Sequence, residues 1–330
     1  MQTHDNLIMP FTVDTLNIRG RVVRLGSVTD TILRRHAYPE EVAKVVAEAM
    51  ALAALLGSSL KSEGRFQIQT KSEGPIESLV VDYAANGAMR AYARYNEDAL
   101  NALLSASDKT INTYDLLGSG ILAMTIDPGG YMKQYQGIVT LDEQGFQGAA
   151  NRYFEQSEQI PTGIRLAVAQ HFENGTQQYR AGGIMAQHLP SSGGKQPVNP
   201  DISEENPASP DKSEQNANDW QEARLLLETV EDHELIDPRL PAENLLFRLY
   251  HEQGVKKYSS LGLFEQCQCS HERVLDMISR FPEAEREDMY DEQQHIGVTC
   301  QFCSRHYDFA KNDINASVLM KKSSPKTFCE

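Results

Sequence analysis

The sequence predicts an α+β protein made of an N-terminal mixed α/β domain with a buried central helix, a helical middle region and a small C-terminal four-cysteine module. Three observations lead to this fold class. The short β-like runs of the N-terminal part lie too close together for a regular βαβ alternation. One predicted helix is apolar on all faces over residues 49–56. The chain has 5 cysteines, and all of them follow residue 266.

The first predicted domain, residues 1–190, contains the β-like runs. They cover residues 66–70, 79–81 and 121–126, and the last run ends at the turn sequence Asp127-Pro128-Gly129-Gly130. Asn174-Gly175 predicts a hairpin between RLAVAQHF and QQYRA. This part is therefore expected to be an α+β core domain rather than a doubly wound sheet.

The central helix of this domain is expected from about residue 39 to residue 61. Pro39 suits a first helical position, and Glu40 and Glu41 suit the positive end of the helix dipole. Its apolar stretch AMALAALL implies burial on most faces. The helix is interpreted as a core element, because no Walker loop, GxSxG or HExxH motif marks a catalytic site.

Residues 191–218 differ sharply in composition. They hold four prolines and seven charged residues, with Val198 and Ile202 as the only large apolar side chains. Such a segment buries too little surface to offset the entropy of ordering it, so a disordered acidic, proline-rich linker is expected.

Residues 219–262 are expected to form a helical region. Apolar residues recur at helical spacing in two stretches, which are Trp220, Ala223, Leu227 and Val230, and then Ala242, Leu245, Leu246 and Leu249. Residues 219–252 contain nine acidic residues and three arginines, so the region is strongly acidic. Two interpretations stay open: a permanently packed helical pair, or an apolar stripe that is sometimes uncovered.

Residues 263–312 contain a CxC pair and, about thirty residues later, a CxxC pair. Cys267 and Cys269 form the first, and Cys300 and Cys303 in VTCQFCSRHYDF form the second. Four thiols in two close pairs provide the ligand count of a tetrahedral zinc site. β-like residues flank the CxxC turn, and helical segments are expected in the interval. One zinc ion with four cysteine ligands is therefore predicted.

Other potential ligands lie nearby. His271, His295 and His306 are close enough in sequence to compete, but four cysteines already complete the set, so surface or supporting roles are expected. Cys329 lies in the predicted C-terminal tail, residues 313–330, and is expected to be an exposed thiol without an assigned role.

The energetics of this module favour a metal-dependent fold. The segment is short and poor in large apolar residues, whereas structural zinc supplies roughly 10–16 kcal/mol. Thiolates are also the form that oxidants attack, and each cysteine has a partner two or three positions away. The spacing thus permits a redox switch but does not require one.

Bulk properties exclude several functions. The net charge is −15, and residues 263–310 carry ten acidic and four basic side chains, which disfavours nucleic-acid binding. The N-terminus has no signal-peptide pattern, and the longest apolar run is too short to cross a bilayer. A cytoplasmic, non-enzymatic protein is expected, with its thiols in a reducing compartment.

Specific motifs resemble the redox-regulated heat shock protein 33 family of bacterial holdase chaperones. The CxC and CxxC order and VTCQFCSRHYDF carry the resemblance in the C-terminal module. In the N-terminal domain the similar stretches are IRGRVVRL, ILRRHAYPEEVAKVVAEAMALAALL, SLKSEG, GPIESLVVDY, YFEQSEQIPT and AGGIMAQHLP. The similarity runs from about Phe11 to Phe309, the linker excepted.

The resemblance implies an ATP-independent holdase that binds unfolding client proteins under oxidative and heat stress. Its reduced form would be a zinc-bound, inactive monomer. Oxidation would form Cys267–Cys269 and Cys300–Cys303 disulfides, release zinc, destabilise residues 220–262 and give an active homodimer. The long linker and Cys329 depart from the family pattern. Two alternatives remain: a zinc-stabilised protein that binds constitutively, and a thiol–disulfide oxidoreductase.

Overall fold

The computed structural model describes residues 5–60, 63–106, 110–130, 132–173, 176–189 and 212–323. The chain divides into two compact units, one ending at Glu265 and the other starting at Gln266. The predicted hairpin turn at 174–175, residues 191–211 of the predicted linker and Cys329 lie outside the described residues.

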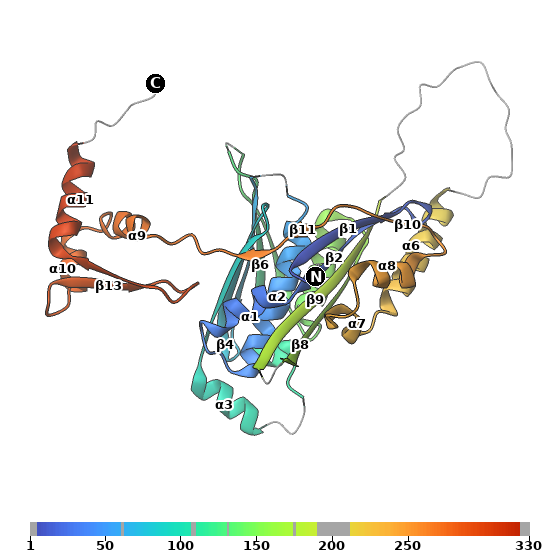
Figure 1. The fold of residues 1–330 in the computed structure, drawn as a ribbon, viewed down its shortest axis with the longest axis horizontal. Coiled ribbons are helices and arrows are strands. Elements are labelled where there is room, and N and C mark those ends of the chain that lie inside the picture. The colour runs from blue at the N-terminus through green and yellow to red at the C-terminus, as the bar shows by residue number, and fades with distance from the viewer. Residues whose placement is uncertain are drawn as a thin grey trace, which may run out of the picture. The chain divides into compact units, whose positions relative to one another are not determined.

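The larger unit contains two sheets of six strands each (Figure 1). The first has the order β10-β1-β2-β9-β8, with β11 also on β1; its strands are β1 (Leu7–Val13), β2 (Ile18–Leu25), β8 (Thr162–Glu173), β9 (Thr176–His188), β10 (Val255–Lys257) and β11 (Leu261–Gly262). The second has the order β12-β5-β4-β3-β6-β7; its strands are β3 (Arg65–Ser72), β4 (Ile76–Ala84), β5 (Ala88–Tyr95), β6 (Gly120–Asp127), β7 (Tyr135–Leu141) and β12 (Phe264–Glu265). All these pairings are antiparallel except β12 with β5.

Helix α2 (Glu40–Gly57) lies between the two sheets (Figure 1). Every residue from Ala49 to Gly57 is buried, which confirms the predicted core helix. Pro39 occupies the N-cap, and the helix ends at Gly57, earlier than expected. Gly57 packs against Tyr83, and the hydroxyls of Ser58 and Ser59 donate to carbonyl oxygens of the last turn. These bonds end the helix.

Seven further α-helices of the described residues surround this core. They are α1 (Ser27–Arg34), α3 (Glu97–Ala106), α4 (Thr113–Leu117), α5 (Gly145–Tyr153), α6 (Lys212–Glu228), α7 (Asp232–Ile236) and α8 (Ala242–Tyr250). None of the helices in the described ranges is long and apolar enough to span a bilayer. The predicted α+β class, with a buried central helix and a helical middle region, is confirmed.

Helices α6, α7 and α8 cover the face of the first sheet that points away from α2 (Figure 1). A second apolar core lies between them; its buried side chains include Phe11, Val22, Ile184, Leu227, Leu235, Leu245 and Leu249. The ring of Tyr250 stacks on that of Phe11 with centroids 5.8 Å apart. The apolar stripes predicted in the middle region are therefore packed against the sheet in this structure.

Two stretches differ from the sequence expectations. Residues 212–218 were predicted to belong to the linker. In the structure they form the first turns of α6, which therefore begins on the N-terminal side of Trp220. Residues 255–265, placed mainly in the helical region, contain β10, β11 and β12 instead. These short strands lack a periodic sequence pattern, and pairing with β1 and β5 fixes them.

The smaller unit consists of a two-stranded sheet and three helices. The strands are β13 (His295–Thr299) and β14 (His306–Ala310), and the helices are α9 (His271–Ile278), α10 (Glu283–Met289) and α11 (Lys311–Ser323). The predicted strands around the CxxC turn and the helices in the interval are confirmed. Helix α11 occupies the start of the predicted tail, where Ile314 is fully buried.

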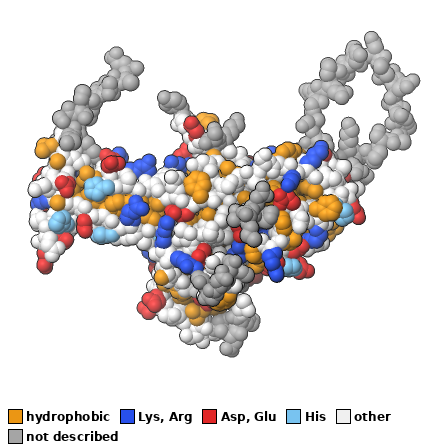
Figure 2. Space-filling model, viewed as in Figure 1, with side chains coloured by type: hydrophobic (Ala, Val, Ile, Leu, Met, Phe, Trp, Pro, Cys, Tyr) orange, Lys and Arg blue, Asp and Glu red, His pale blue; other side chains and the backbone are white. Residues whose placement is uncertain are grey.

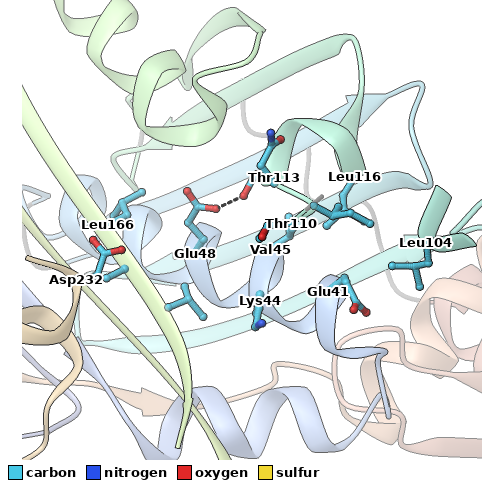
Figure 3. Close-up of a pocket in the computed structure, with 14 residues that line it drawn as sticks. Glu41, Lys44, Val45, Glu48, Leu104, Thr110, Thr113, Leu116, Leu166 and Asp232 are labelled. Carbon is cyan, nitrogen blue, oxygen red and sulfur yellow. Dashed lines mark hydrogen bonds between the residues drawn. The ribbon is translucent and has the colours of Figure 1, made fainter. Parts of the chain in front are cut away.

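Glu48 is a carboxylic acid on the otherwise apolar part of α2. The hydroxyl of Thr113 donates to it at 2.5 Å, as Figure 3 shows. Burial raises the pKa of Glu48 to about 6, and the hydrogen bond from Thr113 offsets only part of this effect. Between pH 4.5 and 6 the folded state therefore holds a proton that the unfolded chain has already lost. The group destabilises the fold increasingly as the pH rises through this range.

Replacing this carboxyl with an uncharged isostere is expected to stabilise the protein in a pH-dependent way. Glu48→Gln should raise the free energy of unfolding at pH 7.5 by about 1–2 kcal/mol and change it little near pH 4.5. Denaturant unfolding at both pH values measures this. Glu41→Gln, on the same helix, is the matched control for loss of a negative charge. Equal stabilisation by Glu48→Gln at both pH values would contradict the assignment.

Candidate functional site

The sulfur atoms of Cys267, Cys269, Cys300 and Cys303 lie within 4.8 Å of one another. The Sγ–Sγ distances are 3.4 Å from Cys267 to Cys269, 3.6 Å from Cys267 to Cys300 and 3.3 Å from Cys269 to Cys303. The structure thus brings together the four residues that the sequence singled out, and their sulfurs form one compact cluster.

The CxC pair lies in the short connection before α9. Ser270 is the N-cap of that helix, and its hydroxyl accepts a hydrogen bond from the Arg273 amide at 3.2 Å. The Arg273 guanidinium also donates to the carbonyl of Gln268, the residue between the two cysteines, at 2.6 Å. The first turn of α9 therefore fixes the backbone that carries Cys267 and Cys269.

The CxxC pair lies in the tight turn between β13 and β14. The amide of Cys300 donates to the Arg305 carbonyl at 2.9 Å, and the amide of Ser304 donates to the Cys300 carbonyl at 2.8 Å. Ser304 has a φ of 56°, in the left-handed region that such a turn uses. The hairpin therefore points both sulfurs to one side.

The Tyr307 hydroxyl donates a hydrogen bond to the Cys269 sulfur at 3.2 Å. Burial by itself raises the pKa of Cys269, but the bonds from Tyr307 and the neighbouring thiols outweigh it and lower the pKa to about 7. Burial raises the pKa of Cys267 and Cys303. Cys269 therefore becomes a thiolate, the form that binds metals and reacts with oxidants, more readily than Cys267 or Cys303.

The nearby histidines do not join the cluster. Within the described residues, the metal-type group at this place contains only the four cysteines. The His271 ring packs on Phe309 with centroids 4.6 Å apart, and His306 shares a 2.8 Å hydrogen bond with Thr299. His295 lies on β13.

The cluster fits a divalent metal that prefers sulfur ligands. Zinc binds cysteine at about 2.3 Å in a tetrahedron, which sets the sulfurs about 3.8 Å apart. The observed separations are close to this value. The donor set is all sulfur, which suits zinc far better than calcium or magnesium. The four cysteines can therefore hold a metal ion, consistent with zinc.

A second functional feature, which sequence reasoning missed, holds the helical region on the sheet. Arg24 on β2 is 1% exposed; it donates to the carbonyls of Asp237 at 2.7 Å and Glu234 at 2.6 Å. Arg180 on β9 donates to the carbonyl of Ile236 at 2.7 Å. Two buried arginines thus satisfy the free carbonyls at the end of α7. The only sequence signal was Arg24 between the apolar residues of Val22-Val23-Arg24-Leu25.

The chain between α8 and the cysteines is also fixed to the larger unit. β10 and β11 pair with β1, and β12 pairs with β5. Glu265, two residues before Cys267, forms a bidentate pair with Arg35 at 2.6 and 2.8 Å. The helical region, the sheets and the first cysteine are therefore linked by a short, well-anchored stretch of chain.

These features define a class of protein: an α+β body with helices packed on one sheet, followed directly by a small four-cysteine module of the metal-binding type. The family model described as Hsp33 protein matches residues 6–310. The chain belongs to the Hsp33 family, which supports a chaperone function.

Individual relatives agree with this assignment. The 33 kDa chaperonin of Caulobacter vibrioides is 37% identical over 303 residues, which cover 92% of this chain and 94% of the relative. That of Nitrosococcus oceani is 31% identical over 327 residues and 99% of both chains. The crystal structure of the Thermotoga maritima 33 kDa chaperonin (heat shock protein 33 homolog) has a TM-score of 0.72 at 18% identity; it covers 97% of this chain and 100% of its own. This structural similarity shows that the chain has the same fold as the Thermotoga maritima protein.

Proposed function

We propose that the protein is an ATP-independent holdase chaperone of the cytoplasm whose client binding is regulated by oxidation. In the reduced form Cys267, Cys269, Cys300 and Cys303 would hold one zinc ion, and α6–α8 would stay packed on the first sheet. In the oxidised form the zinc is released and the apolar faces of this packing become available to unfolding proteins. The observation that carries the proposal is the four-sulfur cluster in a unit with a very small core of its own.

The size of that core makes the smaller unit dependent on its cluster. Its buried apolar side chains within the described residues are Val274, Ile278, Ile296, Tyr307, Phe309 and Ile314. Tyr307 and Phe309 lie on the strand that follows the CxxC turn. So few buried groups offset little of the ordering entropy, and metal binding would supply the rest.

The redox step would join the cysteines within each pair. Two thiolates of Cys267 and Cys269 lose two electrons to a peroxide, which takes up two protons and leaves as two waters, and a second peroxide does the same at Cys300 and Cys303. Disulfide sulfur is a poor zinc ligand, so the oxidised cysteines would no longer hold the ion. A disulfide across CxC closes a small, strained ring, and strained disulfides are readily reduced again.

The closed state offers clients little apolar surface. Exposed large apolar side chains lie on separate elements, for example Ile138 on β7, Phe172 on β8 and Phe247 on α8. On the face shown in Figure 2, hydrophobic side chains are interspersed with charged ones. Release of α6–α8 would uncover the sheet face around Phe11, Val22 and Ile184. The freed surface would also favour dimerisation of the oxidised form from a reduced monomer.

The two alternatives predict different behaviour. An oxidoreductase usually carries its CxxC at a helix start, where the dipole lowers the thiol pKa, whereas here the motif occupies a strand–strand turn. A constitutive binder would not need α6–α8 to leave the sheet. Neither a nucleic acid nor a membrane is proposed as a partner, and no catalysed reaction is proposed.

Aggregation of a heat-denatured test protein, followed by light scattering, tests the function. The peroxide-oxidised protein should suppress aggregation, the reduced zinc-loaded protein should not, and thiol reductant should reverse the effect after zinc is restored. Equal suppression by both forms would favour constitutive binding. Steady turnover of a small disulfide substrate would favour the oxidoreductase.

Tyr307 is expected to tune the metal site through its bond to Cys269. Tyr307→Phe should weaken zinc binding by about tenfold, because groups that hydrogen-bond to a metal ligand typically have effects of this size. Competition with a chromophoric chelator measures the affinity. Tyr290→Phe, which changes a half-buried tyrosine of the same unit that packs beside the core, is the control. An unchanged zinc affinity of Tyr307→Phe would show that the tyrosine does not contribute to the metal site.

A further inference from the structure

β8 is an edge strand with a free side. Within the described residues it pairs with β9 alone, over its whole length from Thr162 to Glu173. The amide of Leu166 donates to the side-chain oxygen of Gln147 on α5 at 3.3 Å, so this amide points away from β9. Alternation along the strand turns the backbone groups of Ile164 and Val168 in the same direction. The outer edge of β8 therefore has strand-type donors and acceptors, and an added strand would replace Gln147 as the partner of the Leu166 amide.

Two cavities lie along consecutive residues of this edge. One, of about 530 Å³, is lined by Leu166, Ala167 and Val168 together with residues of α2 and α4. The other, of about 820 Å³, is lined by residues 162–165 together with residues of α5 and α6. The two cavities thus follow one another along the strand edge.

Two residues that line the larger cavity have a buried polar atom without a partner. The Oδ1 of Asn151 and the Nε of Arg165 are buried and have no hydrogen-bond partner within the described residues. One is an acceptor and the other a donor. A peptide group supplies the matching N–H and C=O, so a polypeptide backbone would satisfy both atoms once release of α6, which lines the same cavity, uncovers them.

The smaller cavity has an apolar wall and an acidic lining. Figure 3 shows Leu166 and Leu116 on its walls, with Glu48 pointing toward Thr113. Three carboxylates line it, those of Glu41, Glu48 and Asp232, against the single cation Lys44, which is paired with Glu40 at 2.5 Å. This excess of negative charge favours a basic side chain with an apolar stem.

We propose that the outer edge of β8, from Thr162 to Val168, binds an extended segment of an unfolded client as an added strand, with side chains of that segment against the walls that α2, α4 and α5 contribute to the two cavities. Strand addition uses main-chain bonds, so it accepts many sequences, as a holdase requires. The inference rests on the proposed chaperone function and assigns it a site. A basic residue next to an apolar one is the preferred occupant of the smaller cavity.

The helical region would control access to this edge. Trp220 and Leu227 of α6 line the larger cavity, and Asp232 of α7 lines the smaller one. Leu227 packs over Gly163, where an added Cβ would lie 2.6 Å from its Cδ2. Asp232 also pairs with Arg165 at 3.2 Å. Release of α6–α8 would therefore open the edge of β8 at the moment when clients are to bind.

Binding of a fluorescent, reduced and carboxymethylated lactalbumin to the oxidised full-length protein tests the proposal by anisotropy. Val168→Pro removes one outward amide and spares the bonds to β9, since proline is tolerated at sheet edges. It should raise the Kd about tenfold. Phe172→Pro, on the same side of the same strand but outside both cavities, is the matched control and should change the Kd less than twofold.

Two further measurements do not depend on the folding of Val168→Pro. Asn151→Leu should raise the Kd about fivefold through loss of one hydrogen bond. In the wild type, deuterium exchange of residues 162–168 should slow when the probe is added, while that of 66–70 should not change. If the oxidised wild type does not bind the probe, the chaperone function and the edge site both fail. Suppose instead that the wild type binds the probe, that both variants bind it with the wild-type Kd, and that the probe does not slow the exchange of residues 162–168. Only the edge site is then wrong.

Discussion

Removing zinc from the reduced protein is expected to unfold residues 266–323 and to leave the two large sheets intact. Structural zinc contributes roughly 10–16 kcal/mol, whereas whole domains are stable by about 5–15 kcal/mol. The core around Phe309 is too small to compensate. A chelator should therefore abolish the helical circular dichroism of α9, α10 and α11.

The matched variants for this prediction are two cysteine substitutions. Cys303→Ser removes a proposed ligand, and it should lose zinc and the fold of the smaller unit without a chelator. Cys329→Ser changes a cysteine outside the cluster, and it should keep both. A metal-free reduced protein with its full helical signal would show that the cluster does not hold the unit together.

Breaking the arginine contacts is expected to activate the protein without oxidation. Arg24→Met keeps apolar bulk but leaves the carbonyls of Glu234 and Asp237 without their donors. Hydrogen bonds to a charged group contribute about 1.5–3 kcal/mol each, so α6–α8 should be held much more weakly. The reduced, zinc-loaded variant should then suppress aggregation of a heat-denatured protein and keep wild-type zinc affinity.

Arg19→Met is the control for this variant. Arg19 lies on the same strand, is exposed, and contacts Gln187 rather than α7. It should leave the reduced protein inactive. If reduced Arg24→Met is also inactive, and its helices exchange deuterium as slowly as the wild type, the contacts do not control the helical region.

Local patterns were enough to predict much of this structure. Eight consecutive apolar residues predicted the burial of α2, and the spacing of the cysteines predicted which four sulfurs meet. A short β-like run and the turn residues after it located β6 and its end at Asp127, where the Gly129 amide donates to the carboxylate at 3.0 Å. In each case the signal and the structure lie within a few residues of one another.

What could not be predicted depends on residues far apart in sequence. β10, β11 and β12 are strands only because β1 and β5 offer free edges. The role of Arg24 requires that β2 lie beneath the end of α7, about 210 residues later. The edge of β8 became visible only once its pairing with β9 was known. Sequence periodicity contains none of these relationships.

The central claim is that the cysteine cluster and the docking of α6–α8 are coupled. Deuterium exchange of the reduced, zinc-loaded protein and of the peroxide-oxidised protein tests it most directly, with released zinc measured on the same samples. We expect residues 217–250 and residues 266–319 to lose protection together as zinc leaves, while β3, β4 and β6 stay protected. If the smaller unit loses protection and zinc while residues 217–250 remain protected, oxidation does not free the helical region and the account is wrong.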